Sequence, residues 1–367
     1  MVKIGMVGVG AISGIYLKNI TEVFKEIELV AVCDLVKEKA EKAKEEYKIS
    51  KIYDTMQELF ADEEIDIVLN LTRPYEHFEV TSAALKAGKH VYSEKPLAAT
   101  LEEGLELVQL AKSKNLMLGG APDTFLGAGI QTCRRLIDEG FIGKPVGAAA
   151  FMICHGHESW HPDPEFYYKH GGGPMMDMGP YYLTAFINLL GGIKSVTGVT
   201  KTTFAQRTIT SQPKAGHIID VEVPTYITGI MEFDSGVVGT LFTTFDVHNR
   251  GQARFEIYGS EGTLLVPDPN TFGGPIYLLR QEESDYKEMP ILYDYAENSR
   301  GLGLADMAKA LETGCSYRAG YKQTLHVLEA MTSFQTSSDK RAAVDLETKF
   351  TREEPMYCNS ITGIIVN

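Results

Sequence analysis

The sequence predicts an α/β fold in which a doubly wound parallel sheet is followed by a second, α+β domain with a largely antiparallel sheet. Three observations carry this prediction. Strand-like and helix-like segments alternate over residues 3–118, which is the pattern of a parallel sheet with crossover helices. Strand-like runs joined by Asp-Ser-Gly and Ser-Glu-Gly turns follow over residues 225–259, as in antiparallel sheets. The 367 residues are enough for two domains, each with its own core.

The first strand, turn and helix are expected at the amino terminus. Residues 3–9 are mostly small or β-branched and apolar, and the glycine-rich run 8–14 opens an amphipathic segment at 15–24. In such a turn the backbone can approach a pyrophosphate, whose charge the start of the helix stabilises. The third glycine of the usual GxGxxG pattern is displaced, because Ser13 takes its place and Gly14 follows. The residues expected to bind a dinucleotide here are Gly8, Gly10, Ala11 and Ile12.

The second strand-like run, residues 28–33, ends in Asp34. A dinucleotide-binding domain places the carboxylate that binds the adenosine ribose roughly 20 residues beyond the glycines. The charge of Asp34 would repel a 2′-phosphate, and the two residues after it include no arginine, so the sequence favours NAD over NADP. Lys37 and Lys39 leave NADP open.

The rest of the first half continues the alternation. The pattern predicts a helix over 37–47, a strand over 65–70 and a helix over 79–87. A further helix over 101–113 and a strand over 116–118 complete this half. We place the domain boundary just after them, at residue 121.

The segment after the strand at 65–70 leaves the sheet where the dinucleotide should lie. Thr72 and Pro74 belong to this segment and are expected to contact the cofactor. His77 follows near the start of the next helix, and a role in starting that helix is expected for it rather than catalysis.

The step Glu94-Lys95-Pro96 places an ammonium group at the carboxyl end of a strand-like run, residues 90–92. Ligands bind at that end of the strands in an open α/β sheet. Pro96 biases Lys95 toward an extended conformation, so the lysine is held in one direction. A positioned cation suits the polarisation of a substrate oxygen. The tripeptide alone is more typical of a surface lysine, and it is the surrounding motifs that indicate catalysis.

The second half starts with a predicted helix over 130–139 and a strand over 146–154, and it ends with a helix over 321–333. Between them, the run 171–182 (GGGPMMDMGPYY) leads into another helical segment. If this helix begins near Asp177, then Asp177 and Tyr181 are four residues apart and share one face. A carboxylate and a phenol are therefore expected to project together.

These motifs, taken in order, resemble the Gfo/Idh/MocA family of oxidoreductases over nearly the whole chain. The family has the glycine-rich turn, the Glu-Lys-Pro step and the pattern GGG…Asp-x-Gly-x-(His or Tyr). The resemblance implies a Rossmann domain (1–121) and a substrate-binding and oligomerisation α+β domain (122–367) with an open, mostly antiparallel sheet. It also implies homodimers or homotetramers, and hydride transfer between NAD(P) and an alcohol or ketone carbon of a sugar, cyclitol or related polyol. Lys95 matches the family's active-site lysine, Glu94 its cofactor-contacting neighbour and Asp177 its substrate-side carboxylate.

Tyr181 stands where much of the family has a catalytic histidine, and the chain resembles glucose-fructose oxidoreductase and dimeric dihydrodiol dehydrogenase in this respect. A phenol with an ordinary pKa near ~10 is a poor base at neutral pH. We expect the Lys95 ammonium to lower the pKa of Tyr181, which would then exchange the substrate proton. Tyr182 is the competing candidate.

The segment from His157 to His161 satisfies the HExxH pattern of zinc hydrolases. That pattern binds zinc only on a helix, and Gly156 and Pro162 argue against a helix here, so no metal site is expected. We expect a loop that holds His157, Trp160 and His161 over the substrate pocket. A packed, irregular loop is an equal alternative.

Composition and charge argue against some classes of partner and indicate the cellular compartment. The net charge of −14 would repel nucleic acid and anionic membranes, and we see no apolar run long enough for a membrane span. The five scattered cysteines and a start without signal-peptide features predict a cytoplasmic protein. Two alternatives to a dehydrogenase stay open within the family's fold, a redox-neutral NAD-dependent hydrolase or epimerase and a non-catalytic NAD(P)-sensing regulator.

Overall fold

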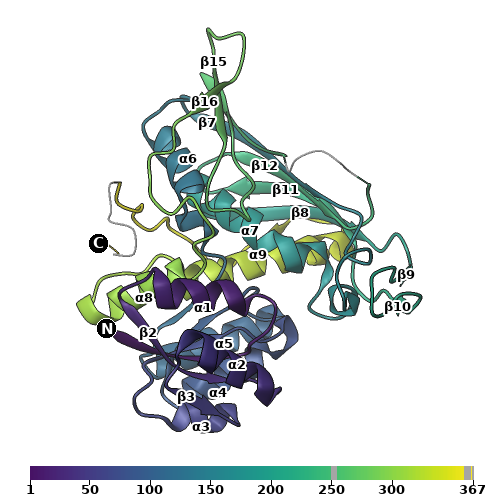
Figure 1. The fold of residues 1–367 in the computed structure, drawn as a ribbon. Helices are drawn as coiled ribbons and strands as arrows, with labels where there is room; N and C mark the ends of the chain where they lie inside the picture. The colour runs from purple at the N-terminus through teal and green to yellow at the C-terminus, as the bar shows by residue number, and fades with distance from the viewer. Residues whose placement is uncertain (249–253, 359–364, 366–367) are drawn as a thin grey trace.

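The computed structural model describes residues 1–248, 254–358 and 365 and has two large sheets, one above the other in Figure 1. The first is a six-stranded parallel sheet in the order β3-β2-β1-β4-β5-β6. Its strands are β1 (Val2–Val7), β2 (Ile27–Cys33), β3 (Lys51–Tyr53), β4 (Ile67–Asn70), β5 (His90–Ser93) and β6 (Leu118–Gly120). Its helices are α1 (Ser13–Glu22), α2 (Lys37–Tyr47), α3 (Met56–Ala61), α4 (His77–Lys86) and α5 (Leu101–Ser113).

The strand order confirms the predicted doubly wound sheet. The chain runs outward from β1 through β2 to β3, then returns beside β1 and runs outward again from β4 to β6. The switch point therefore lies between β1 and β4, where an open α/β sheet binds its ligand. The predicted helix over 37–47 coincides with α2, whereas β3 and α3 are too short to have shown a period in the sequence.

The second sheet has nine strands in the order β16-β15-β14-β13-β7-β12-β11-β8-β17. Among its described strands only β7 and β12 pair in parallel, so the prediction of a mostly antiparallel sheet is confirmed. Its strands are β7 (Pro145–Ile153), β8 (Ile193–Lys201), β11 (Tyr226–Phe233), β12 (Val238–Thr244), β13 (Arg254–Gly259), β14 (Gly262–Leu265), β15 (Ile276–Arg280), β16 (Lys287–Met289) and β17 (Val344–Asp345). A separate hairpin is formed by β9 (Gln206–Thr208) and β10 (Ile218–Asp220).

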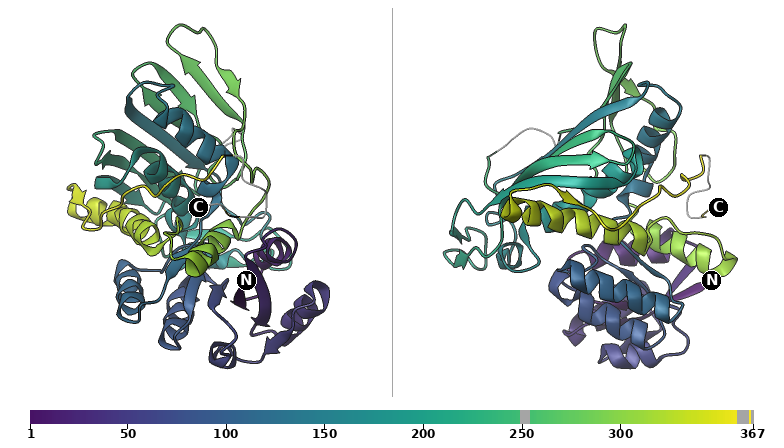
Figure 2. Two further views of the ribbon diagram at one scale, coloured as in Figure 1. Left: turned by 90° about the vertical axis from the view of Figure 1, so that its left-hand side faces the viewer. Right: turned by 180° about the vertical axis from the view of Figure 1, so that it is seen from behind.

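Helices cover one face of the second sheet. They are α6 (Ala128–Asp138), α7 (Gly173–Leu190) and α9 (Tyr321–Lys340), and within the described ranges no helix covers the opposite face. Figure 2 shows α9 running between the two sheets. The open face predicted from the family resemblance is therefore present.

The carboxyl-terminal helices also contact the first sheet. After α8 (Leu302–Thr313) the chain passes β6, where Gly120 donates a backbone hydrogen bond to the Ala319 carbonyl at 3.0 Å. A Cβ at Gly119 would lie 2.7 Å from the same oxygen, so glycine is needed for this close approach. The predicted boundary between 121 and 122 stays a prediction, and residues 249–253, 359–364 and 366–367 of the predicted second domain lie outside the described residues.

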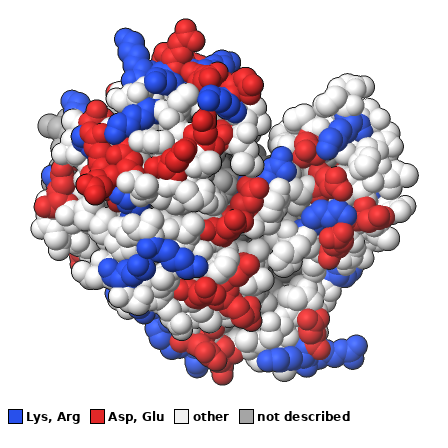
Figure 3. All heavy atoms as spheres, turned by 90° about the horizontal axis from the view of Figure 1, so that it is seen from below, with Lys and Arg blue, Asp and Glu red and all other residues white. Residues whose placement is uncertain are grey.

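The surface charge and the length and polarity of the helices are relevant to nucleic acid and membranes, the two partners that the sequence argues against. Acidic side chains spread over much of the face seen in Figure 3, with basic ones interspersed among them. Among the described helices none is both long and apolar enough to cross a membrane.

Candidate active site

The glycine-rich turn joins β1 to α1 beside the switch point. Gly8 has φ +99°, and a Cβ there would lie 2.8 Å from the Leu71 backbone, so this position requires glycine. A Cβ at Gly10, by contrast, would meet no described atom within 4 Å. Helix α1 begins at Ser13 with no side-chain cap among the described residues. The turn at Gly10, Ala11 and Ile12 thus leaves room and backbone N–H groups for an anionic ligand.

Asp34 lies at the end of β2 against this turn. Its carboxylate accepts hydrogen bonds from the backbone N–H groups of Val9 at 2.6 Å and Val36 at 2.8 Å. The group is half-buried, so its remaining lone pairs can accept further hydrogen bonds. Lys37, which left NADP open, forms an ion pair with Asp54 at 2.7 Å.

The loop after β4 is tied to the Glu-Lys-Pro step. Asn70 Oδ1 accepts hydrogen bonds from the backbone N–H and the hydroxyl of Thr72, at 3.1 and 2.6 Å. Pro74 begins a short 3-10 helix. The buried ring of His77, the first residue of α4, lies 2.7 Å from the Pro96 carbonyl and 3.1 Å from the Thr72 carbonyl. His77 therefore links two segments that border the switch point as well as starting its helix.

Glu94 lies beneath this region and is buried. The Tyr16 hydroxyl donates a hydrogen bond to Glu94 Oε1 at 2.7 Å, and the Lys95 backbone N–H donates to Oε2 at 2.9 Å. The carboxylate is thus held between α1 and the end of β5.

Lys95, Asp177 and Tyr181 come together as expected. Lys95 Nζ donates a hydrogen bond to Asp177 Oδ1 at 2.9 Å and another to the Asp177 backbone oxygen, and it lies 5.1 Å from the centre of the Tyr181 ring. Burial lowers the pKa of Lys95, but the charges of Asp177, Tyr181 and Glu94 together raise it further, so its net pKa is above the ordinary value. Lys95 is therefore a permanent cation at neutral pH.

The prediction that Lys95 gives Tyr181 a lowered pKa is wrong. Lys95 does act to lower the pKa of Tyr181, as does Arg300, but burial acts more strongly in the other direction and the net pKa lies above 10.0. Tyr181 is only 7% exposed, and removal from water disfavours the phenolate. The sequence showed the neighbouring charge but not the depth of burial.

Arg300 is a residue of this site that the sequence reasoning missed. It comes from the segment before α8, and its guanidinium lies near the Tyr181 hydroxyl and acts to lower the pKa of that phenol. It also donates a hydrogen bond to Asn270 Oδ1 at 2.7 Å. No motif surrounds Arg300, so only the tertiary structure brings it to Tyr181.

Tyr182 does not share the environment of Tyr181. It is 1% exposed, and its ring centre lies 6.2 Å from that of Phe255 in the core of the second sheet. Helix α7 begins at Gly173, four residues before the predicted start, and Asp177 and Tyr181 remain on one face. The helix therefore directs Tyr181 toward Lys95 and Tyr182 into the core.

The HExxH segment forms a turn, as predicted, and not a helix. The His161 N–H donates to the His157 carbonyl at 3.0 Å, and the two rings both contact Tyr167, His157 in a stack at 3.8 Å and His161 edge-on at 5.5 Å. Trp160 is 63% exposed, with its ring centre 5.4 Å from that of His157. Among the described residues, no group of three or more His, Cys, Asp or Glu is arranged to hold a metal ion.

His157 is the part of this loop that reaches the Lys95 site. Its Nε2 lies 3.6 Å from Asp177 Oδ2. Trp160 and His161 lie farther out along the same turn, with a ring separation of 5.5 Å. The three residues predicted to cover a substrate are therefore neighbours, and one of them touches the catalytic candidates.

Arg207 in β9 holds the loop and was also missed by the sequence reasoning. Its buried guanidinium pairs with Glu158 at 3.1 Å and with Asp246. On the outer side of this cluster, His155 and His248 stack with their ring centres 3.5 Å apart and line a pocket of about 570 Å³. None of the residues that line this pocket is Lys95, Asp177 or Tyr181.

Comparison with known proteins places this geometry in a family. Residues 2–120 match the model of the oxidoreductase family with an NAD-binding Rossmann fold, and residues 130–265 match the GFO/IDH/MocA C-terminal domain. A structure of levoglucosan dehydrogenase with NADH and levoglucosan has a TM-score of 0.80 at 21% identity, and the match covers 95% of this chain and 99% of that one. This likeness shows the fold.

Two curated relatives are cyclitol dehydrogenases. An inositol 2-dehydrogenase/D-chiro-inositol 3-dehydrogenase of Lactiplantibacillus plantarum is 31% identical over 147 residues, 39% of this chain and 42% of that protein. A myo-inositol 2-dehydrogenase of Thermotoga maritima is 24% identical over 305 residues, 83% of this chain and 86% of that protein. Several relatives match over only about half of their own length. The two family matches together span more than half of the chain, which thus belongs to the Gfo/Idh/MocA family of NAD-binding oxidoreductases.

Proposed function

We propose that the protein is an NAD-dependent dehydrogenase or reductase that acts on a CH–OH carbon of a sugar, cyclitol or related polyol. The observation that carries the proposal is the Lys95–Asp177 pair at the carboxyl end of β5. Both side chains keep 16% of their surface exposed although they are hydrogen-bonded to each other. A cation and a carboxylate within reach of solvent, beside a dinucleotide turn, suit a substrate hydroxyl.

The residues present fit the cofactor. We propose that Gly8, Gly10, Ala11 and Ile12 hold the pyrophosphate, because the turn leaves space at Gly10 and uncapped N–H groups at α1. We assign Asp34 to the adenosine ribose, and Thr72, Pro74, Glu94 and Lys95 to the rest of the dinucleotide. The paired Lys37 and the free acceptor capacity of Asp34 support NAD over NADP. When bound, NAD supplies the hydride acceptor for oxidation of an alcohol carbon.

The other roles in the reaction fall to side chains of the protein. We propose that Lys95 donates a hydrogen bond to the substrate oxygen and that Asp177 fixes both Lys95 and the substrate hydroxyl. Two groups border this pair and could exchange the proton, Tyr181 as expected from the sequence and His157 from the loop. His157, Trp160 and His161 would cover the bound substrate. The resemblance to the tyrosine-bearing members stays a prediction.

A substrate panel tests the function. Purified protein is incubated with NAD or NADP and a set of sugars, cyclitols and dihydrodiols, and NAD(P)H formation is followed by absorbance. We expect turnover with at least one polyol and a preference for NAD. An absence of turnover across the panel, in both directions, would contradict the proposal.

We further propose that the open face of the second sheet joins two copies of the chain into a homodimer or part of a homotetramer. The register places three exposed apolar side chains on this open face, Val199, Ile230 and Val238. An apolar sheet face of this kind favours burial against a partner. Light scattering should give an even multiple of the 40.5 kDa chain, and Ile230→Asp should dissociate it. A monomeric wild type at micromolar concentration would contradict the proposal.

The division of the chain at residues 121 and 122 is also proposed here, supported by family matches that end at 120 and begin again at 130. A cytoplasmic location, and the expectation that neither nucleic acid nor membrane is a partner, stay predictions.

A further inference from the structure

Two side chains contact the two oxygens of one carboxylate. Lys95 Nζ lies 2.9 Å from Asp177 Oδ1, and His157 Nε2 lies 3.6 Å from Asp177 Oδ2. The side chain of His157 is 11% exposed and those of Lys95 and Asp177 are 16% exposed, so each of the three keeps some accessible surface beside its neighbour. A hydroxyl that accepts a hydrogen bond from Lys95 would therefore lie close to the imidazole.

Tyr181 is placed less favourably for proton exchange. The Arg300 guanidinium and the buried Glu94 carboxylate both lie close enough to its hydroxyl to act on its pKa in opposite directions. The Lys95 ammonium lies over its ring, 5.1 Å from the ring centre, and among the described residues that ammonium hydrogen-bonds only to Asp177. A buried phenol that is engaged by a guanidinium and faces a carboxylate is suited to holding Lys95 in place.

We propose that His157 Nε2 exchanges the hydroxyl proton of the substrate and that Tyr181 is a positioning residue for Lys95. This inference rests on the proposed function. In the oxidation the carbinol C–H bond breaks and its hydrogen leaves with both electrons to NAD, which is reduced. The O–H bond breaks, its electron pair forms the carbonyl, and the proton bonds to His157 Nε2 beside the Asp177 carboxylate. Reduction of the ketone follows the same path in reverse.

The charged and titratable groups that face His157 are Asp177, Glu158, His161, Lys95 and Tyr167, whose ring stacks on the imidazole. Burial lowers the pKa of His157 more strongly than Asp177 and Glu158 raise it, and His161 and Lys95 act with burial. The imidazole is therefore neutral at pH 7 and able to accept a proton. Its Nδ1 has no hydrogen-bond partner among the described residues, so no acceptor group is tied to Nδ1, and the tautomer that accepts the substrate proton at Nε2 is the one with its hydrogen on Nδ1.

The loop around His157 is held by contacts with other segments of the chain. The Glu158 backbone oxygen accepts hydrogen bonds from the N–H groups of Thr210 and Ser211, both at 2.9 Å, and the Glu158 side chain pairs with Arg207. The His157 ring stacks on Tyr167 with an interplanar angle of 7°. A proton-transfer group must be fixed in this way if it is to meet the substrate in one orientation.

The pH dependence of wild-type kcat/KM separates the two candidates. If His157 is the base, oxidation rises with pH through an apparent pKa below the ordinary imidazole value of 6.5 and then levels off. If Tyr181 is the base, the rate continues to rise toward pH ~10 or above. The second profile would overturn the inference.

Substitutions test the same point. His157→Phe keeps the ring stack on Tyr167 and removes the nitrogen, and His157→Gln keeps a polar group facing Asp177. Each should lower kcat by ~10²–10⁴-fold with NADH binding retained. Tyr181→Phe should lower kcat less and leave the apparent pKa in place. Loss of the acid-side pKa in Tyr181→Phe, or near-wild-type kcat in both His157 variants, would overturn the inference. The exposed His217 offers a matched control, because His217→Gln makes the same change outside the site.

Imidazole NMR supplies a readout that does not depend on turnover. The chain has nine histidines, and the signal absent from His157→Gln but present in His217→Gln belongs to His157. Its pKa in the free enzyme should agree with the kinetic value. A His157 signal whose pKa differs clearly from the kinetic pKa would overturn the inference even where the enzyme turns over. If the wild type turns over no polyol, the proposed function itself fails. If the wild type is active and the His157 variants are equally active, only the inference about His157 fails.

Discussion

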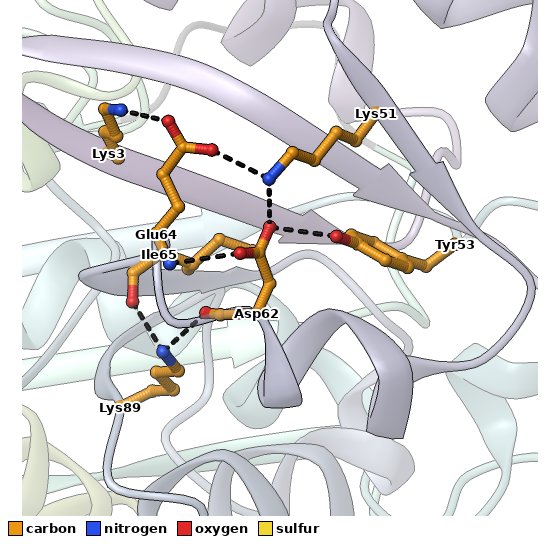
Figure 4. A network of polar contacts seen from close by, with 7 residues as sticks. All are labelled: Lys3, Lys51, Tyr53, Asp62, Glu64, Ile65 and Lys89. Carbon is orange, nitrogen blue, oxygen red and sulfur yellow. Dashed lines mark hydrogen bonds and ion pairs between the residues drawn. The ribbon is translucent and has the colours of Figure 1, made fainter.

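The parallel sheet carries charged side chains at both of its ends, and the two ends differ in how completely those charges are paired. At the amino end, Lys51 Nζ lies 2.7 Å from both Asp62 and Glu64, and a second oxygen of Glu64 pairs with Lys3. Lys89 Nζ donates to two backbone oxygens at 2.7 and 2.8 Å. The residues of this amino-end network are Lys3, Lys51, Tyr53, Asp62, Glu64, Ile65 and Lys89 (Figure 4).

At the carboxyl end the same kinds of group keep part of their hydrogen-bonding capacity. Asp34 is held by two backbone N–H groups but is half-buried and can accept more bonds. Lys95 has two described acceptors, both on Asp177, for its three donors. The turn at Gly10 leaves open space above the start of α1.

The difference separates groups that serve the fold from groups that serve a ligand. In the amino-end network each charge finds its partner within the chain, which adds a modest amount of stability because the pairs are near solvent. At the carboxyl end, capacity that is not used within the chain can be offered to a cofactor or a substrate. Charge alone does not identify a site, since both ends contain lysines and carboxylates.

The largest effect is expected when one lysine at each end of the sheet is replaced by methionine and the two variants are compared. Lys95→Met removes the donor to the substrate oxygen, and turnover should fall roughly 10²–10³-fold, while NADH still binds through the glycine-rich turn and Asp34 although one of its contacts is lost. Lys51→Met removes a lysine of equal charge from the amino-end network and should leave turnover near that of the wild type. Steady-state kinetics and NADH titration check both. A similar loss of turnover in the two variants would break the distinction between the ends.

A smaller effect is expected at Asp34. Asp34→Ser removes the charge that should bind the ribose hydroxyls, and the loss of a charged hydrogen bond of ~1.5–3 kcal/mol corresponds to ~10–100-fold weaker NAD binding. The discrimination against NADP should shrink at the same time, because the repulsion of the 2′-phosphate disappears. Binding titrations with both cofactors measure this. Unchanged NAD affinity would mean that Asp34 does not contact the ribose.

The smallest effect is expected in the amino-end network. Lys51 and the backbone of Glu64 hold the pKa of Asp62 at about 2, below its ordinary value of 3.8. A carboxyl group with a lowered pKa contributes its full stability above pH ~4 and loses it as the pH falls toward 2. Asp62→Asn should therefore lower the free energy of unfolding by about 1 kcal/mol at pH 7 and by less at pH 3. Urea denaturation at both pH values measures it, and an equal loss at both would contradict the assignment.

The sequence predicted the parts of the site that depend on local pattern. The turn at Gly8, the acid at Asp34 and the step at Lys95 each follow a strand, and the ends of parallel strands meet at one edge of the sheet. The i, i+4 spacing of Asp177 and Tyr181 likewise predicted a shared face, because helix geometry is local.

The parts that were missed depend on tertiary burial and distant contacts. Arg300 meets Tyr181 across more than a hundred residues of chain, and nothing in the residues around it marks a partner. Arg207 lies on a three-residue strand, too short for a period. The pKa of Tyr181 was predicted in the wrong direction because the depth of burial is a property of the assembled core. His157 was expected to bind substrate, but its contact with Asp177 arises only when the loop packs on α7.

The central claim is that the carboxyl end of the parallel sheet transfers hydride from a polyol carbon. A substrate found in the panel is labelled with deuterium at the carbinol carbon, and the reduced cofactor is analysed by mass spectrometry. The account predicts NADH one mass unit heavier than with unlabelled substrate, together with a slower rate where chemistry limits turnover. Reduced cofactor without deuterium, or product formed with no reduced cofactor, would contradict it.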